Sequence, residues 1–256
     1  MLLITILTAH AWADTPTEPP VPAEVRASVP VPAEAPSVDE AVALLEGCSE
    51  PGVCEFACWD NASRIVEPAA NGSLRLICYQ DDQAHGPMVV WRDSGRPEGV
   101  GFSNRGVPHG GFRSWHPNGQ RATEGRWDNG KAVGELTTWH PTGRRSSAGI
   151  WVDGLQEGLV THWHANGKVS EIGHWVGGEP DGPMFSWYED GAKSSQARFK
   201  DGEPHGRWRE WHPNGKRSLV ARFKHGEEIH MRCWDAAGKQ AVCPRDESEG
   251  TDEGAQ

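Results

Sequence analysis

The sequence is poor in apolar residues and has no long hydrophobic run after its first residues. Only 36% of its 256 residues are hydrophobic, so a thick two-layer core would be hard to fill. No later apolar stretch is long enough to span a bilayer. Helix formers are sparse, whereas glycine (31), proline (19) and tryptophan (13) are abundant. This composition favours short strands joined by tight turns, in an elongated single-layer sheet.

Recognisable catalytic motifs are missing. The sequence contains no Gly-x-Ser-x-Gly, no His-Glu-x-x-His and no phosphate-cradling loop. Adjacent carboxylates such as Glu189 and Asp190 fall in predicted turns and are most simply solvated charges. We therefore predict a protein that is not an enzyme and has no cofactor.

The chain also lacks a basic stripe. Residues 85–230 hold 19 Lys and Arg against 17 Asp and Glu, and the rest of the chain holds 6 against 19. The net charge of −11 therefore comes from the flanks. A nucleic-acid groove needs concentrated positive charge, so we expect no nucleic-acid partner and no attraction to an anionic membrane surface.

Cysteine is absent from the central part of the chain, and all six cysteines lie in the flanks. An even number in an exported protein suggests disulfides. Free thiols and a metal site are the alternatives, but a metal site would more naturally show two closely spaced pairs. The six residues are Cys48, Cys54, Cys58, Cys78, Cys233 and Cys243.

The N-terminus has the pattern of an export signal. Residues 2–7 are apolar, and Ala11-Trp12-Ala13 fits the small-x-small pattern before a cleavage point at Asp14. No Lys or Arg precedes the apolar run, so the true start codon could lie upstream, and the alternative is an apolar start that is never cleaved. We predict export to the periplasm, cell envelope or medium. No cysteine lies just after the run, which gives no support for a lipid anchor.

The central part of the chain is a tandem repeat of 24 residues. Tryptophan recurs six times without a slip, and three glycine columns keep the same period, which identifies a repeat architecture. The tryptophans are Trp91, Trp115, Trp139, Trp163, Trp187 and Trp211. The glycine columns begin at Gly86, Gly95 and Gly106 and each runs through six copies.

Each copy is predicted to be a β-hairpin. In the second copy, residues 111–116 and 121–127 form the strands, and His116-Pro117-Asn118-Gly119 forms the tight turn between them. A second turn at residues 128–130 leads to the next copy. The prediction is an all-β, elongated single-layer antiparallel meander, about 60 Å long for six copies.

Two further columns indicate how the hairpins pack. Most return strands carry an aromatic residue, shifted by one position to Phe102 in the first copy, and a Gly or Ala lies two residues before Trp127 and its equivalents. We expect this small residue to let a neighbouring tryptophan lie flat over the backbone. A third column, with Phe112 in the second copy, lies three residues before the tryptophan. This odd spacing places the two on opposite faces unless a bulge intervenes.

The ends of the array are predicted to be caps. The tripeptide Cys-Trp-Asp occurs at Cys58 and again at Cys233. We interpret residues 59–79 as a degenerate copy and residues 234–243 as a truncated one. Disulfides Cys58–Cys78 and Cys233–Cys243 would staple these caps and leave Cys48–Cys54, although fifteen pairings are formally open.

The predicted organisation has six parts. Ser37 followed by Glu40 is a capping-box pattern for a helix over residues 38–46, ended by Gly47. The parts are a signal peptide (1–13), a Pro/Ala-rich linker expected to be extended (14–36), an N-terminal cap (37–84), six repeats (85–229), a C-terminal cap (230–243) and an acidic tail (244–256).

The repeat resembles the bacterial MORN-variant (MORN_2-type) repeat. The resemblance rests on Trp115-His116-Pro117-Asn118-Gly119-Gln120 and on Trp211 to Lys216, each followed by a small residue, an aromatic and a turn glycine. It covers residues 85–229, or 57–243 with the caps. It implies a β-hairpin scaffold and no catalytic residues. Some members of the family are labelled antitoxins of toxin–antitoxin systems.

Histidine and tryptophan are the candidate binding residues. Histidine follows the tryptophan at His116, His140, His164 and His212, but neighbouring copies lie about 10 Å apart and a zinc–histidine bond is about 2 Å. We therefore predict no metal site and interpret these histidines as turn-flanking residues. The six tryptophans either pack the sheet or contact a ligand.

Three functions remain open from the sequence. The first is an exported scaffold for protein–protein or cell-envelope interactions, through the tryptophans or a sheet edge. The second is an antitoxin-like protein that binds and neutralises a partner toxin in the cytoplasm. The third is glycan or cell-wall binding through the aromatic columns.

Overall fold

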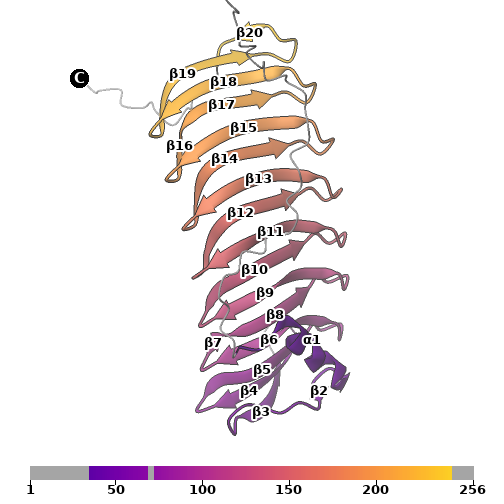
Figure 1. Ribbon diagram of the computed structural model, residues 1–256. Helices are drawn as coiled ribbons and strands as arrows, with labels where there is room; N and C mark the ends of the chain where they lie inside the picture. Colours follow the sequence, from indigo (N-terminus) through magenta and orange to yellow (C-terminus); the bar gives the residue numbers. More distant parts are fainter. Residues whose placement is uncertain (1–34, 69–71, 244–256) are drawn as a thin grey trace, which may run out of the picture.

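The computed structural model describes residues 35–68 and 72–243, which form one long antiparallel sheet of successive hairpins (Figure 1). The sheet begins with β3 (Ser63–Pro68) and ends with β20 (Gln240–Ala241) at the opposite end of the array. The helix α1 (Val38–Glu46) and a small hairpin lie beside its first strands. The predicted all-β repeat array is confirmed. The predicted signal peptide, residues 14–34 of the linker and the acidic tail lie outside the described residues.

Each repeat supplies a first strand and a return strand. The small hairpin is β1 (Cys48–Glu50) and β2 (Val53–Cys54). The first strands are β5 (Gln83–Trp91), β8 (Gly110–Trp115), β10 (Lys131–Trp139), β12 (Leu155–Trp163), β14 (Glu179–Trp187), β17 (Gly206–Trp211) and β19 (Glu227–Trp234), with short β7 (Val107–Pro108) and β16 (Glu203–Pro204) before two of them. The return strands are β4 (Leu74–Gln80), β6 (Pro97–Asn104), β9 (Arg121–Asp128), β11 (Arg145–Val152), β13 (Val169–Val176), β15 (Lys193–Lys200) and β18 (Arg217–Lys224).

The turns follow from the residues at their corners. In the tight turn between β8 and β9, the Gly119 amide donates to the His116 carbonyl at 2.9 Å, and Gly119 has φ +88°. The turn between repeats uses two residues of positive φ, Asn129 (45°) and Gly130 (83°). That is the conformation of a type I′ turn, which matches the twist of the flanking strands.

The glycine column that begins at Gly86 marks a β-bulge inside each first strand. The pairing of β10 with β9 shifts between Val133 and Thr137, and Gly134 there has φ +71°. A bulge inserts extra residues on one strand and bends it. Because the same bulge recurs once per repeat, the bend recurs as well.

The pairing separates the side chains onto two faces. Phe112 lies opposite Gly125 in the hairpin and its ring lies 5.4 Å from that of Trp127. The register shift between Ser114 and Trp115 places its extra residue, Ala122, on β9, so side chains still alternate along β8. Trp115, three residues from Phe112, therefore lies on the other side, where it packs against the cluster that contains Trp91. We call the side with the Trp91, Trp115, Trp139, Trp163, Trp187 and Trp211 column the tryptophan face. The side with the Gly101, Gly125, Gly149, Gly173, Ala197 and Ala221 column is the glycine face.

The expected packing of a neighbouring tryptophan over the small residues is found at some copies and not at others. A Cβ added at Gly149 would lie 3.0 Å from Cγ2 of Val160, and one at Gly125 would lie 3.1 Å from Cε1 of Phe112. The small residues therefore make room for the column that includes Phe112 and Val160. The tryptophans of the Trp91 to Trp211 column lie on the other face, but Trp175 reaches this space, since a Cβ at Gly173 would lie 3.4 Å from its Nε1, and Trp208 pairs opposite Ala221.

The one-residue shift at Phe102 also changes its face. A shift of one position in a strand moves a side chain to the opposite side of the sheet. Phe102 is buried in the cluster that contains Trp91, and its ring stacks on Trp59 at 5.6 Å with an interplanar angle of 7°. The first repeat thus closes the N-terminal core on the tryptophan face.

Both ends of the sheet are stapled by disulfides. The bonds Cys58–Cys78 and Cys233–Cys243 form at the two ends, and Cys48–Cys54 joins β1 to β2. Ser63 pairs with Tyr79 in the β3–β4 hairpin, which precedes the first repeat.

Candidate functional site

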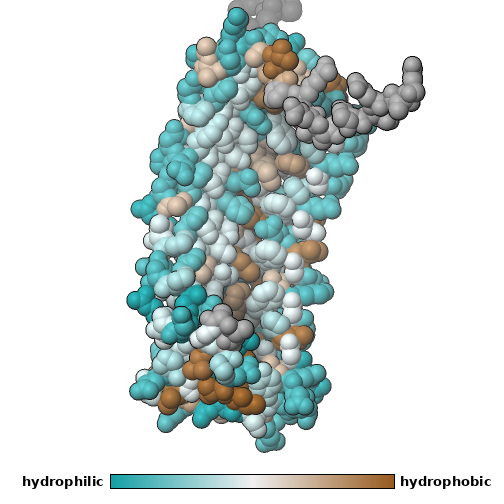
Figure 2. Space-filling view, turned by 180° about the vertical axis from the view of Figure 1, so that it is seen from behind, coloured by the Kyte–Doolittle hydropathy of each residue, from teal (hydrophilic) through white to brown (hydrophobic). Residues whose placement is uncertain are grey.

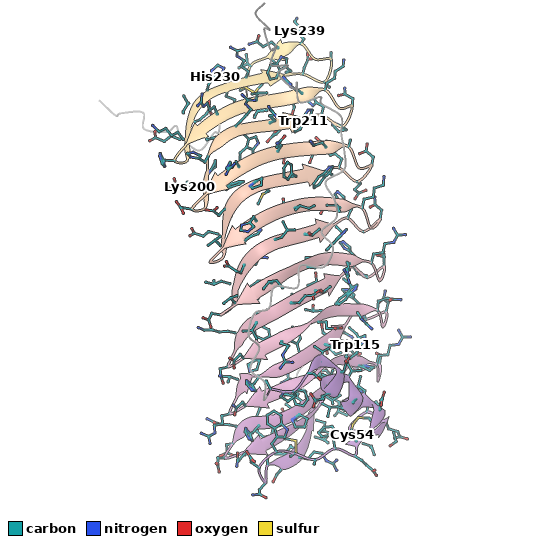
Figure 3. All side chains as sticks on the ribbon, in the orientation of Figure 1. Cys54, Trp115, Lys200, Trp211, His230 and Lys239 are labelled. Atoms are coloured by element: carbon teal, nitrogen blue, oxygen red, sulfur yellow. A yellow bond between two sulfur atoms is a disulfide. The ribbon has the colours of Figure 1, made fainter. Side chains whose placement is uncertain are left out.

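The tryptophan face is covered at its N-terminal end by the chain itself. Ser37 and Glu40 form the predicted capping box, and α1 buries Ala41 in the cluster with Trp91, while Trp115 packs against its edge. Trp91 is only 3% exposed, so it belongs to the core and not to a binding surface. Figure 3 shows Trp115 beside the helix and Trp211 near the far end of the array.

Docking of the cap requires a bare backbone on β8. The Gly111 amide donates to the Pro36 carbonyl at 2.7 Å, and a Cβ at Gly111 would lie 2.2 Å from the Val38 amide nitrogen. The neighbouring strand adds a second contact, because the Arg126 guanidinium donates to the Ala35 carbonyl at 2.7 Å. The chain therefore enters the described structure on the tryptophan face, at β8 and β9.

Beyond β9 the tryptophan face continues without the helix. Trp139, Trp163, Trp187 and Trp211 are half-buried there. Two of these rings lie under cations from the preceding repeat: Arg121 is 5.9 Å from the centroid of Trp139, and Lys193 is 5.4 Å from that of Trp211. Such cation–π contacts occupy the ring surface that a sugar would stack on.

A shallow depression lies at one of these tryptophans. It has a volume of about 560 Å³ and is lined by Arg144, Arg145, Trp163, Asn166 and Gly167. Arg145 occupies the same repeat position as Arg121. The face therefore presents aromatic rings with positive charge beside them, which suits an extended chain carrying apolar and acidic residues.

The residue after each tryptophan joins one repeat to the next. His140 Nε2 lies 2.7 Å from the carbonyl oxygen of Trp163, and the Tyr188 hydroxyl donates to the Trp211 carbonyl at 2.6 Å. A carbonyl only accepts, so the histidine donates. We call this series the donor ladder. Its members are Arg92, His116, His140, His164, Tyr188 and His212, each facing the carbonyl of the next tryptophan.

The donor ladder was not predicted from the sequence, although a signal was present. His, Tyr and Arg share little except a hydrogen-bond donor at the end of a side chain of medium or long reach. Their exchange at one repeat position therefore indicates a common acceptor. Within the described residues no group of three or more His, Cys, Asp or Glu side chains could hold a metal ion.

At the opposite edge of the sheet, where the turns between repeats lie, backbone hydrogen bonds join each repeat to the next. The Gly130 amide donates to the Pro108 carbonyl at 2.8 Å, and the Gly154 amide donates to the Ala132 carbonyl at 2.9 Å. The same bond recurs at each turn between repeats. Each pair of neighbouring repeats is thus joined by hydrogen bonds at both edges of the sheet, which makes the array stiff. We call the junction between two neighbouring repeats a seam.

Two ionisable groups of the N-terminal cap are perturbed. Hydrogen bonds from the backbone and side chain of Ser37 lower the pKa of Glu40, with a smaller contribution from the charge of Arg126. Burial, followed by the charge of Glu67, raises the pKa of Tyr79. Both groups lie at the cap and neither has the setting of a catalytic acid or base.

Comparison with known families supports the repeat assignment. Residues 156–176 and 204–225 match the MORN repeat variant. Each matched segment spans one hairpin, β12–β13 and β16–β18, and the remaining copies share its tryptophan and glycine columns. No curated protein matches the chain. Within the described residues no helix has the length and apolar character needed to cross a membrane.

Proposed function

We propose that this protein is an exported, non-enzymatic repeat scaffold that binds proteins or other components of the cell envelope. The observation that carries the proposal is that all six cysteines are in disulfides. Disulfides persist in oxidising compartments, whereas cytosolic thiols are kept reduced. The apolar start and the small-x-small motif before Asp14 support the same compartment.

The binding surface that we propose is the part of the tryptophan face beyond β9, which the helix α1 does not cover. We call it the uncovered tryptophan face. Of the six candidate tryptophans, Trp91 is buried and Trp115 packs against the cap. The proposed contacts are therefore Trp139, Trp163, Trp187 and Trp211. Three observations support this choice. The rings are half-buried, cations lie beside two of them, and the hydrogen bonds at both edges stiffen the sheet.

The mass of the intact protein, isolated from its host without reduction, tests export. We expect a chain that begins at Asp14 and lacks two hydrogens for each of three disulfides, recovered from the envelope or the medium. The same sample after reduction is the control. A full-length, fully reduced protein found only in the cytoplasm would contradict the proposal and favour an intracellular, antitoxin-like role.

A peptidoglycan pull-down separates the scaffold from a glycan-binding protein. We expect no retention, because Arg121 and Lys193 already lie over two of the rings. Retention that is lost in Trp163→Ala would instead assign glycan binding to the tryptophan face.

A further inference from the structure

We infer that the uncovered tryptophan face is a docking surface for an extended acidic, proline-containing segment, and that its occupant is residues 14–34 of this same chain. The first reason is where the described chain begins. Ala35 and Pro36 are bound to β9 and β8 through Arg126 and Gly111. The preceding residues therefore start at the boundary between the covered and the uncovered parts of this face.

The second reason is length. Polyproline II rises about 3.1 Å per residue, so 21 residues span roughly 65 Å. Paired strands lie about 4.8 Å apart, so each two-stranded repeat advances the array by roughly 10 Å. The distance from β9 to the C-terminal end of the array is then about 50 Å, and residues 14–34 are long enough to cover it.

The third reason is the match of two spacings. The segment carries Val-Pro-Ala-Glu twice, beginning at Val21 and at Val31. Ten residues of polyproline II span about 31 Å. The two cation-covered rings, Trp139 and Trp211, are three repeats apart, which is about 29 Å. The two copies of the motif therefore fall on two equivalent sites of the array.

The fourth reason is charge. Residues 14–34 hold four acidic residues and one arginine, whereas Arg121 and Lys193 lie over the rings of the two equivalent sites. In each motif the glutamate comes three residues after the valine, on the side nearer β9. With Val31 at Trp139 and Val21 at Trp211, Glu34 lies near Arg121 and Glu24 lies near Lys193.

This docking goes beyond the proposed function and does not depend on it. It makes the tryptophan face a surface that is occupied in cis. A partner then reaches Trp139 to Trp211 only by displacing residues 14–34, which limits binding to partners that compete with that segment.

Site-specific photo-crosslinking in the full-length protein tests the inference. A benzoylphenylalanine placed at Val31 is expected to react near Trp139, and one placed at Val21 is expected to react near Trp211, both within one chain. Peptide mass spectrometry of the linked products identifies the sites. Crosslinks to the glycine face, crosslinks spread over both faces, or links between two chains that rise with protein concentration would overturn the inference.

Charge reversal supplies matched controls. Arg121 has a side chain 53% exposed, and we expect Arg121→Glu with Lys193→Glu to lower the crosslink yield about fivefold, since two exposed ion pairs are lost and like charges are introduced. Lys200→Glu with Lys224→Glu, at exposed positions on the opposite edge, should leave the yield unchanged. Adding Glu24→Lys and Glu34→Lys to the first variant should restore it. Equal yields in all of these variants would contradict the inference, and restoration also shows that the reversed chain folds.

Discussion

The Nε2 atom of His140 lies 2.7 Å from the carbonyl oxygen of Trp163, in the next repeat. Five other residue pairs repeat this relationship along the array with Arg, His or Tyr as the donor. The hydrogen bond between repeats therefore depends less on the type of donor residue than on the length of its side chain and on the presence of an N–H or O–H group. Stability measurements on single-site variants can separate these two properties.

His140→Ala should lower the free energy of unfolding by about 1 to 3 kcal/mol, because the Trp163 carbonyl is left without its partner in a half-buried place. His140→Tyr should retain most of the stability, since Tyr188 makes the same bond two repeats later. Urea unfolding of the three proteins is the measurement. Equal loss in both variants would mean that the imidazole ring packs there and that its hydrogen bond is unimportant.

Gly111→Ala should dislodge the N-terminal cap. The added Cβ would meet backbone atoms of Ser37 and Val38 at 2.2 to 2.4 Å, and backbone cannot move aside as a flexible side chain does. We expect the protection of residues 38–46 from hydrogen exchange to fall, at a cost of about 1 to 3 kcal/mol. Gly99→Ala is the control, because its nearest new contact is the Arg113 carbonyl oxygen at 3.7 Å. Unchanged exchange in Gly111→Ala would disprove the close docking.

The start of α1 should weaken in acid. The pKa of Glu40 is lowered from its ordinary value of 4.5 by hydrogen bonds from Ser37. A carboxyl whose pKa is lower in the folded state stabilises that state above its ordinary pKa, and this contribution is lost as the pH falls through the folded pKa. Hydrogen exchange of residues 37–41 should therefore accelerate, relative to the rest of the chain, as the pH falls below 4.5. Glu40→Gln should remove this pH dependence, and its persistence there would assign it to another group.

Loss of one or the other disulfide of the N-terminal cap should destabilise the protein unequally. Cys58 and Cys78 are separated by 20 residues and Cys48 and Cys54 by 6. The constraint on the unfolded chain is then worth about 3 kcal/mol for the longer loop and about 2 kcal/mol for the shorter one. Thermal unfolding of Cys58→Ser/Cys78→Ser and of Cys48→Ser/Cys54→Ser compares them. The reverse order would show that Cys48–Cys54 has a larger part in holding α1 on the sheet.

The hairpins were predictable because their geometry is local. Pro117-Asn118-Gly119 specifies a tight turn wherever it occurs, and a column of turn glycines requires positive φ in every copy. The 24-residue period then fixed the architecture. The positions of Cys58 and Cys233, where the period ends, favoured the observed cysteine pairing, although the sequence left fifteen pairings open.

The cap could not be placed from local patterns. The capping box of Ser37 and Glu40 predicted α1 itself, but its docking depends on a contact with β8, about 70 residues later. One departure from the repeat marks that contact. At the position of Gly111 the other copies carry Pro87, Glu135, Leu159, Pro183 and Arg207, and the missing side chain is where the chain crosses the strand. Likewise, the odd spacing of Phe112 and Trp115 assigns the Trp115 column to the face opposite the glycine column.

The seams between repeats set how this protein could evolve in length. In all copies the residue after one tryptophan faces the carbonyl of the next tryptophan, whether that residue is Arg, His or Tyr. Removal of residues 140–163 would bring Trp139 directly before His164, which would still face the carbonyl of Trp187. An in-frame duplication or loss of one whole copy therefore changes the reach of the array by one step and leaves no unmatched seam. The length of such a protein can therefore change with the number of its repeats while the contacts between neighbouring repeats stay the same.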